Sequence, residues 1–315
     1  MSAGPDLEAI RTARRRIAPY IHRTPVLTSS SLDERSAAKV FLKCENLQRT
    51  GSFKIRGASN AVFSLSEEEA RRGVVTHSSG NHAAALALAA RLRGIPAWIV
   101  MPSNAPEVKR RAVEAHGGQI ALCEPTLAAR ETTATELMAR TGAQLIHPYN
   151  DMRVIAGQGT AALELLEEVP DLDILIAPVS GGGLLSGTAI AAKSLRPGIR
   201  VIGAEPKNAD DAFRSFASGK LEPAATAHTI ADGLRATLCP LTLTIVRERV
   251  DEIATVEEEE IVSAMRWVWE RVKVVIESSA AVAVEPALDR KIESEGKHIG
   301  IILSGGNLDL GALPF

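Results

Sequence analysis

Three consecutive glycines are the first feature of this sequence that could do chemistry. Gly181, Gly182 and Gly183 follow Ser180, between an apolar stretch typical of a strand and a pattern typical of a helix. The backbone N–H groups of such a loop converge on one small anion, and the positive end of the helix dipole adds to the attraction. The spacing fits neither GxGxxG nor GxxxxGK(S/T). The loop therefore favours a small phosphorylated ligand over a dinucleotide, and the alternative is a tight turn that binds nothing.

A single lysine near the start of a predicted helix is the second feature. Lys54 lies in the sequence GSFKIRG at residues 51–57, among small residues and next to Phe53. A helix N-terminus and burial both disfavour an ammonium group, so both lower the pKa of a lysine. A neutral lysine amine can form a Schiff base with a carbonyl group. Lys54 is therefore a candidate covalent anchor, and the alternative is a solvated surface cation.

Two further corners carry small and polar residues after predicted strands. One corner has the sequence SSGNH at residues 78–82, and the other has LSGGN at residues 303–307. Hydroxyl groups, amides and the free N–H groups of a helix start bind small polar ligands. A helix cap with a surface histidine would explain the first corner equally well when taken alone. Four such corners in one chain favour a ligand site.

Strand and helix patterns alternate along the chain and would position these corners. Strand patterns cover residues 40–42, 74–76, 97–101, 119–122, 144–147, 173–178, 200–204 and 298–303. Helix patterns cover residues 7–20, 53–65, 83–92, 107–116, 127–140, 154–168, 184–195, 257–272 and 280–292, and residues 218–239 are typical of loops. This alternation predicts an α/β fold with two parallel sheets. Ligands of such sheets bind beyond the carboxyl ends of the strands, where the corners lie.

Length and composition exclude several classes of protein. A chain of 315 residues is long enough for about two domains. The 36 basic and 38 acidic residues give a net charge of −2, and aromatic residues make up 3%, so neither nucleic acid nor a membrane surface is indicated as a partner. Cys44, Cys123 and Cys239 lie far apart, which favours neither disulfides nor a thiolate metal site. No stretch is apolar for the roughly 18 residues of a membrane helix, and we expect a cytoplasmic protein.

The motifs together resemble those of the fold-type II pyridoxal-phosphate enzymes, in the branch of serine racemases and serine/threonine dehydratases that includes 3-hydroxyaspartate dehydratases. The matching motifs, in family order, are GSFKIRGA at 51–58, SSGNH at 78–82, VIAGQGT at 154–160, SGGGLLSG at 180–187, GAEPKNADD at 203–211, ADG at 231–233 and LSGGN at 303–307. The resemblance implies a tryptophan synthase beta-like α/β fold of two domains, each a mostly parallel sheet flanked by helices. Residues 1–72 and 151–315 would form the large cofactor domain, and residues 73–150 the small domain.

The resemblance also implies how the chain holds pyridoxal phosphate. The residues around the cofactor would be Phe53, Lys54, Asn81, Gly181, Gly182, Gly183, Leu184, Glu277 and Ser304. Lys54 would hold the cofactor as a Schiff base, Asn81 would bond the ring hydroxyl, and the glycines would cradle the phosphate. Ser304 would meet the pyridine nitrogen. A neutral hydroxyl there leaves the ring a weaker electron sink than a carboxylate would, which suits elimination of a β-substituent.

Substrate and metal sites follow from the same resemblance. The substrate would contact Ser78, Ser79, Asn81, His82, Arg130 and Arg235. Ser79 would stand opposite the lysine and supply a second base for racemisation, and the alternative is a serine that caps the helix. Glu205, Ala209 and Asp211 match the divalent-cation site of the family, where two carboxylates and a carbonyl suit Mg²⁺, Ca²⁺ or Mn²⁺. The alternative is a solvated acidic loop.

Several positions depart from the family pattern. Ser180 stands where a fourth glycine is common, and Ala83-Ala84 stand where Gly-Gln or Ala-Gln is usual. Tyr149 replaces a residue that is Asn in serine racemases and often Phe in threonine dehydratases. Arg235 could pair with a second substrate carboxylate, since a guanidinium group binds a carboxylate through two hydrogen bonds. This favours a dicarboxylic substrate such as 3-hydroxyaspartate, and the alternative is a surface cation.

We therefore expect a lyase that removes water from 3-hydroxyaspartate, L-serine or L-threonine and releases a keto acid and ammonia. The alternatives are a serine racemase and a non-catalytic module that binds a small phosphorylated ligand. The resemblance implies a homodimer acting on a small amino acid. Because the chain stops at Phe315, soon after the last motif, we expect no separate regulatory domain.

Overall fold

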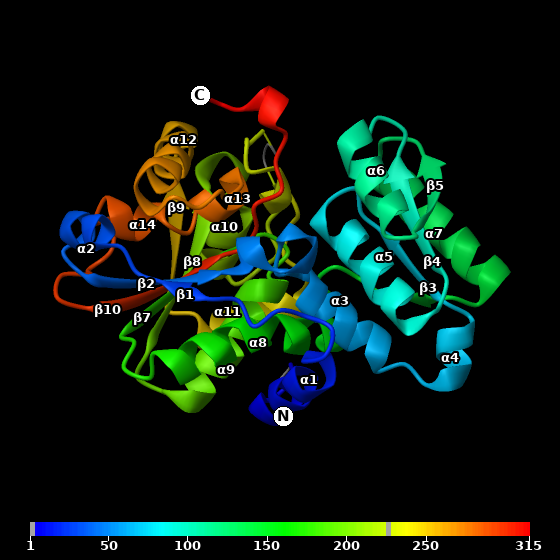
Figure 1. The fold of residues 1–315 in the computed structure, drawn as a ribbon, viewed down its shortest axis with the longest axis horizontal. Helices are drawn as coiled ribbons and strands as arrows, with labels where there is room; N and C mark the ends of the chain where they lie inside the picture. Colours follow the sequence, from blue (N-terminus) through cyan, green and yellow to red (C-terminus); the bar gives the residue numbers. More distant parts are fainter. Residues whose placement is uncertain (1–3, 225–227) are drawn as a thin grey trace.

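A computed structural model describes residues 4–224 and 228–315, and the larger of its two sheets occupies the left half of Figure 1. Within these residues the larger sheet has six strands in the order β1-β2-β10-β7-β8-β9. They are β1 (Val26–Leu27), β2 (Lys39–Cys44), β7 (Ile174–Pro178), β8 (Arg200–Pro206), β9 (Glu252–Val256) and β10 (His298–Leu303). Only β1 runs antiparallel to its neighbour. The last strand of the described chain, β10, thus lies inside the sheet between β2 and β7.

The smaller sheet has four parallel strands in the order β5-β4-β3-β6, again counted over the described residues. They are β3 (Val74–His77), β4 (Ala97–Pro102), β5 (Gln119–Cys123) and β6 (Gln144–Leu145). The central strands β3 and β4 are buried along most of their length. This burial explains their nearly continuous apolar sequence, because helices cover both faces of the sheet.

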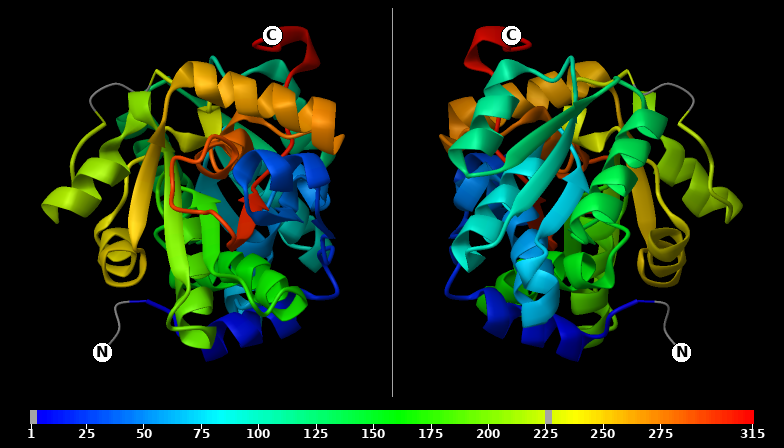
Figure 2. Two further views of the ribbon diagram at one scale, coloured as in Figure 1. Left: turned by 90° about the vertical axis from the view of Figure 1, so that its left-hand side faces the viewer. Right: turned by 90° about the vertical axis from the view of Figure 1, so that its right-hand side faces the viewer.

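Helices cover both faces of the larger sheet, as the two side views in Figure 2 show. One face packs against α1 (Leu7–Ile17), α8 (Met152–Glu168), α9 (Gly183–Leu195) and α11 (Pro240–Arg249), with α10 (Asp211–Ser218) beside α11 and β9. The other face packs against α2 (Ser30–Ser36), α12 (Glu258–Trp267), α13 (Ser278–Ala281) and α14 (Glu285–Leu288). Each face has its own hydrophobic core.

The helix α3 (Lys54–Phe63) joins the two sheets. It packs against α8 of the larger sheet and against α5 (Asn81–Arg93) of the smaller one. Its residues Ile55, Ala58 and Val62 belong to a core shared with α5 and with α6 (Glu107–Ala115), while α4 (Glu67–Arg71) adds one buried alanine. The opposite face of the smaller sheet is covered by α7 (Leu127–Thr141). The boundaries at residues 72 and 150 stay a prediction.

A buried ion network fixes α3 close to its start. The Arg56 guanidinium donates to both oxygens of Glu45, each at 2.7 Å, and to both oxygens of Glu164, at 2.9 and 2.8 Å. The Lys43 ammonium donates to Glu164 at 2.7 Å and to the carbonyl of Thr24 at 2.7 Å. None of the four charged side chains is more than 5% exposed. Two cations and two carboxylates therefore balance one another away from water.

Most predicted elements are confirmed, with ends that differ by a few residues. The predicted helix over residues 280–292 is wrong, because α13 ends at Ala281 and the separate α14 ends at Leu288. Pro286 fits only the first turn of a helix, and Arg290 has a left-handed backbone with φ of 54°. The patterns missed β1, α2, α4, α10, α11 and β9. Residues 225–227 of the predicted loop at 218–239 lie outside the described residues. Within the described ranges, no helix is long and apolar enough to cross a membrane.

Candidate active site

Lys54 is the first residue of α3, and the segment before it is attached to the loop that follows β10. The Phe53 N–H donates to the Ser304 carbonyl at 3.0 Å, and the Gly306 N–H donates to the Gly51 carbonyl at 2.9 Å. Ser304 is 3% exposed. The lysine corner and the C-terminal corner, about 250 residues apart in sequence by their numbers, therefore form one unit.

The Lys54 amine has an environment that suits a nucleophile. Its Nζ donates to the Pro148 carbonyl at 3.5 Å and lies 4.9 Å from the centre of the Phe53 ring. Loss of water around the amine lowers the pKa of Lys54 to about 8, although the Glu277 carboxylate opposes this shift. A measurable share of the amine is therefore neutral near pH 7, as a Schiff-base lysine requires.

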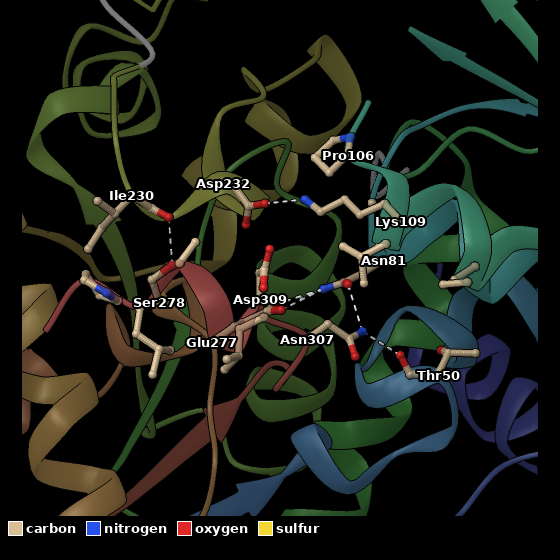
Figure 3. Close-up of a pocket in the computed structure, with 18 of the residues that line it drawn as sticks. Thr50, Asn81, Pro106, Lys109, Ile230, Asp232, Glu277, Ser278, Asn307 and Asp309 are labelled. Carbon is tan, nitrogen blue, oxygen red and sulfur yellow. Dashed lines mark hydrogen bonds and ion pairs between the residues drawn. The ribbon is translucent and has the colours of Figure 1, made fainter. Parts of the chain in front are cut away.

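The residue four positions before the lysine has a strained backbone. Thr50 has φ of 61°, a left-handed conformation that is costly for a β-branched residue. The Asn307 side-chain amide donates to the Thr50 carbonyl at 2.6 Å and to Asn81 Oδ1 at 3.0 Å (Figure 3). The sequence patterns did not single out Thr50, and they placed Asn307 only within a motif. No local signal marks such a long-range contact.

Two predicted cofactor residues, Asn81 and Glu277, contact each other in Figure 3. The Asn81 Nδ2 donates to the two carboxylate oxygens of Glu277 at 3.0 and 3.2 Å. Glu277 is 5% exposed, and burial raises the pKa of its carboxyl to about 7. Asn81 begins α5 beside the smaller sheet, whereas Glu277 precedes α13 beside the larger one. The pair therefore bridges the two sheets next to Lys54.

The glycine loop follows β7 and leads into α9. Gly182 is the N-cap of α9 with φ of 86°, and no side chain caps this helix end. A Cβ on Gly181 would lie 2.3 Å from the Tyr149 ring, and a Cβ on Gly182 would lie 2.7 Å from the Leu238 side chain. Glycine is therefore required both by the backbone and by close packing. The N–H groups of the first turn, including that of Leu184, have no acceptor within the helix and can bind an anion.

The serine corner places a second helix N-terminus in the same region. The N-cap of α5 is Gly80, and no side chain caps the helix. The alternative that Ser79 is the cap is therefore wrong. Ser78 Oγ accepts a long hydrogen bond of 3.4 Å from the Gly80 N–H. Ser79 is partly exposed, so its hydroxyl is available to a ligand.

The His82 ring is buried and neutral. Its Nε2 lies 3.1 Å from the Ile146 carbonyl, and burial, followed by the charge of Lys54, lowers the pKa of His82 to about 3. The Nε2 proton is therefore donated to Ile146, because a carbonyl can only accept. Nδ1 has no partner within the described residues. The ring cannot donate to a substrate carboxylate, so a contact from His82 would have to come from its backbone N–H.

The two arginines assigned to the substrate differ in their surroundings. Arg235 is exposed and donates to the Thr229 carbonyl at 2.6 and 3.2 Å. Arg130 lies in α7, where its Nε donates to the Thr126 carbonyl at 3.4 Å and its charge, after burial, lowers the pKa of His77. Arg235 thus has a structural contact of its own, and its other guanidinium donors remain available.

The residues of the predicted cation site lie between β8 and α10. The Glu205 carboxylate accepts from the Ala212 and Phe213 N–H groups at 2.9 and 2.7 Å. Both carboxylate oxygens of Asp211 are buried, and the nearby backbone N–H groups of Asp211 and Leu238 partly offset the effect of burial on its pKa. Ala209 is 1% exposed in the turn before α10. Burial raises the pKa of Glu205 to about 9 and that of Asp211 to about 6, so a nearby cation would favour their charged forms.

A cavity of about 660 Å³ opens between the two sheets, next to the Asn81–Glu277 pair. Asn81, Glu277 and Asn307 line it, and Lys109 on α6 forms an ion pair across it with Asp232 (Figure 3). It is large enough for a small substrate. Within the part of the chain that the structure describes, three or more His, Cys, Asp or Glu side chains nowhere cluster as metal ligands.

Comparison with known proteins decides the family. A family model described as "Pyridoxal-phosphate dependent enzyme" matches residues 17–305. The chain belongs to this family. It is 53% identical over 313 residues to a serine racemase of Arabidopsis thaliana, covering 98% of this chain and 95% of that protein. It is 48% identical over 311 residues to the beta-hydroxyaspartate dehydratase of Paracoccus denitrificans, covering 99% of both.

Solved structures agree with this assignment. The structure of maize serine racemase matches with a TM-score of 0.96 and 51% sequence identity, covering 98% of this chain and 95% of that chain. The predicted fold class, two mostly parallel sheets flanked by helices as in fold-type II enzymes, is therefore confirmed. The cofactor of the family, pyridoxal phosphate, is confirmed with it.

The residues present fit pyridoxal phosphate. The Lys54 amine is partly neutral, the uncapped start of α9 offers N–H groups to a phosphate, and the buried Ser304 lies beside Phe53. These features come from the larger-sheet side, and Asn81 adds an amide from the smaller-sheet side. The buried carboxylate oxygens of Asp211 likewise fit a divalent cation.

Proposed function

We propose that this chain is a pyridoxal-phosphate-dependent dehydratase, an ammonia-lyase that removes water from a β-hydroxy amino acid and releases a keto acid and ammonia. The observation that carries the proposal is the Lys54 amine, which begins α3 with a pKa of about 8 beside the glycine loop and the Asn81–Glu277 pair. The beta-hydroxyaspartate dehydratase of Paracoccus denitrificans is 48% identical over nearly all of both chains, which supports the same reaction.

Different site residues would bind different parts of the cofactor. Lys54 would bind it covalently, and Gly181, Gly182, Gly183 and Leu184 would bind its phosphate at the start of α9. Ser304 would bind the ring nitrogen, and Phe53, Asn81 and Glu277 would contact the ring. Bound pyridoxal phosphate withdraws electrons from the substrate Cα and so makes its proton acidic. The Lys54 amine would be the base that accepts this proton. The neutral Ser304 hydroxyl favours loss of the β-hydroxyl group over prolonged storage of negative charge.

The start of α5 binds the substrate carboxylate. Its free N–H groups, with Ser78, Ser79, the Asn81 amide and the His82 backbone, provide the donors at a positive helix end. The small domain, residues 73–150, closes toward the large domain, residues 1–72 and 151–315, and excludes water from the cleft. The Lys109–Asp232 ion pair across the cavity supports such a closure.

Racemisation is a second activity of the same site. Ser79 is partly exposed and does not cap α5, so its hydroxyl is available to exchange a proton at the face opposite Lys54. The serine racemase of Arabidopsis thaliana is 53% identical to this chain. Replacing Ser79 by Ala should abolish interconversion of L- and D-serine. The variant should still release a keto acid from the enantiomer of serine that Lys54 deprotonates. Equal interconversion by the variant would refute this role of Ser79.

The substrate is a dicarboxylic β-hydroxy amino acid such as 3-hydroxyaspartate. Arg130 and the free donors of Arg235 are the candidates for binding its second carboxylate. Arg235→Gln should raise KM for 3-hydroxyaspartate and leave KM for L-serine unchanged. An unchanged ratio of the two KM values would exclude Arg235 and leave Arg130 to be tested in the same way.

A divalent cation, Mg²⁺ with Ca²⁺ or Mn²⁺ as substitutes, binds Glu205, the Ala209 carbonyl and Asp211. The two buried oxygens of the Asp211 carboxylate support this site. Chelation should lower the unfolding temperature, and Asp211→Asn should remove the response to added Mg²⁺. A chelator without effect on unfolding would contradict the cation site. We further propose that the protein is a homodimer, which the family resemblance supports. We place it in the cytoplasm, because its three cysteines lie far apart in sequence and favour no disulfide framework.

Keto-acid release tests the proposed reaction directly. The purified protein with pyridoxal phosphate and Mg²⁺ is given L-serine, D-serine, L-threonine and each stereoisomer of 3-hydroxyaspartate. We expect release from 3-hydroxyaspartate, loss of release in Lys54→Ala, and unchanged release in the surface control Lys297→Ala. If no substrate yields a keto acid but borohydride still fixes the cofactor on Lys54, the protein is a racemase rather than a dehydratase. If borohydride fixes no cofactor on Lys54, the result favours a non-catalytic module that binds a small phosphorylated ligand.

A further inference from the structure

The serine that replaces a common glycine makes two hydrogen bonds to one residue. Ser180 follows β7 directly and precedes Gly181. Its Oγ accepts from the Ala236 N–H at 2.9 Å and donates to the Ala236 carbonyl at 2.9 Å. One hydroxyl thus holds both backbone polar groups of Ala236. A glycine at position 180 would make neither bond.

Ala236 belongs to residues 229–238, which we name the cleft segment and which contain one short 3-10 helix, η4 (Asp232–Leu234). The side of the segment away from the glycine loop has its own contacts. The Gly233 N–H donates to Ser279 Oγ at 3.0 Å, the Ile230 N–H donates to Glu258 at 2.9 Å, and the Ser278 hydroxyl donates to the Ile230 carbonyl at 2.8 Å. Ala231 and Leu234 are buried in the core, and Arg235 donates to the Thr229 carbonyl within the segment. Leu238 packs against the glycine loop, where a Cβ on Gly182 would lie 2.7 Å away. Side-chain hydrogen bonding to the glycine loop therefore comes from Ser180, and apolar packing comes from Leu238.

The other side of the cleft segment faces the cavity. Ile230 and Asp232 line it, and Asp232 reaches across to Lys109 on α6 (Figure 3). Arg235, the candidate for the second substrate carboxylate, is the direct neighbour of Ala236. A displacement of the Ala236 backbone would therefore move both the Asp232 contact and Arg235.

We propose that Ser180 is a positioning residue that couples the glycine loop to the cleft segment, so that an anion bound at the loop orders the segment and the ordered segment strengthens anion binding. An anion on the N–H groups of the loop reduces the freedom of the residues next to it. The Ser180 hydroxyl transmits that restriction to Ala236, because both of its bonds need a fixed loop. Coupling of this kind acts equally in both directions.

The experiment compares hydrogen exchange in the full chain. Exchange of peptides from residues 229–238 is measured by mass spectrometry without ligand, with inorganic phosphate and with pyridoxal phosphate. The proteins are the wild type, Ser180→Gly, Ser180→Thr and a matched control, Ser64→Gly. Ser64 also donates one hydrogen bond to a backbone carbonyl, that of Ala61 at 2.8 Å, at the end of α3 opposite Lys54.

In the wild type and in Ser64→Gly we expect either anion to slow exchange of the cleft segment. Ser180→Gly should lose this slowing and bind pyridoxal phosphate roughly three- to tenfold more weakly, the factor typical of one neutral hydrogen bond. Ser180→Thr should restore both. Because the segment faces the substrate, KM should rise in Ser180→Gly while kcat changes little.

Slowing of exchange in Ser180→Gly equal to that in the wild type would overturn the inference. So would equal cofactor affinity of the two proteins. If Ser180→Gly does not fold, Ser180→Ala takes its place with the same expectations. The inference rests on the cofactor of the proposed function, but the two can be refuted independently. Absence of a Lys54 adduct refutes the proposed function, whereas the exchange measurement with inorganic phosphate still tests the coupling.

Discussion

Replacing Arg56 by Met tests whether the buried ion network stabilises the fold around Lys54. The guanidinium makes five hydrogen bonds, to Glu45, Glu164 and Thr160. Its removal leaves Lys43 as the one cation of the network for two carboxylates that are at most 5% exposed. Breaking a buried ion pair on one side costs about 3–5 kcal/mol. Adding the energies of all five hydrogen bonds would overstate the loss in the free energy of unfolding. A buried carboxylate without a cation takes up a proton, which limits the cost.

Thermal and urea unfolding of the cofactor-free protein measure this loss. At about 2 °C per kcal/mol for a chain of this size, the unfolding temperature should fall by roughly 6–10 °C. Arg56→Lys keeps the charge and should lose less. The matched control is Arg266→Met, since Arg266 pairs with Glu270 on an exposed helix face and should change stability by less than about 1 kcal/mol. A loss in Arg56→Met no larger than in the control would refute the reasoning.

Gly182→Ala should destabilise the chain by about 1–2 kcal/mol, because φ of 86° disfavours any Cβ and Leu238 lies against it, whereas Gly198→Ala, with open space around it, should be neutral in urea unfolding. Burial raises the pKa of Glu277 from 4.5 to about 7, so the carboxyl stabilises the fold below pH 4.5 and loses this effect as pH rises through 7. Glu277→Gln should therefore raise the unfolding temperature of cofactor-free protein at pH 8 and not at pH 4.5, and equal shifts at both would contradict this. Burial lowers the pKa of His147 from 6.5 to about 4, so His147 stabilises the fold above pH 6.5 and less as pH falls toward 4. His147→Asn should flatten the loss of stability across that range in thermal unfolding, and an unchanged slope would exclude His147 as its cause.

Much of the site was predictable because parallel sheets bring distant loops together. Each motif corner follows a strand and precedes a helix or turn, and local patterns suffice to find such transitions. The carboxyl ends of adjacent parallel strands then share one edge. Lys54 accordingly lies beside Ser304, through the Phe53 hydrogen bond, and beside Pro148, which precedes the tyrosine that covers Gly181.

Other features depend on contacts that no local pattern records. The left-handed Thr50 is held by Asn307, and Arg56 is paired with Glu164, 108 positions away. The break between α13 and α14 could have been found from Pro286, but the apolar run around it resembled one helix. Ser180 was noted as a departure, although only the fold shows that its hydroxyl meets Ala236.

The place of β10 has a consequence for synthesis of the chain on the ribosome. β10 pairs with β2 on one side and with β7 on the other, although both are made long before it. Until residues 298–303 emerge, β2 and β7 expose unpaired backbone edges in the middle of the unfinished sheet. A nascent or truncated chain is therefore prone to aggregation and dependent on chaperones. The same late strand delivers Ser304, so the lysine corner is completed only when the sheet itself closes.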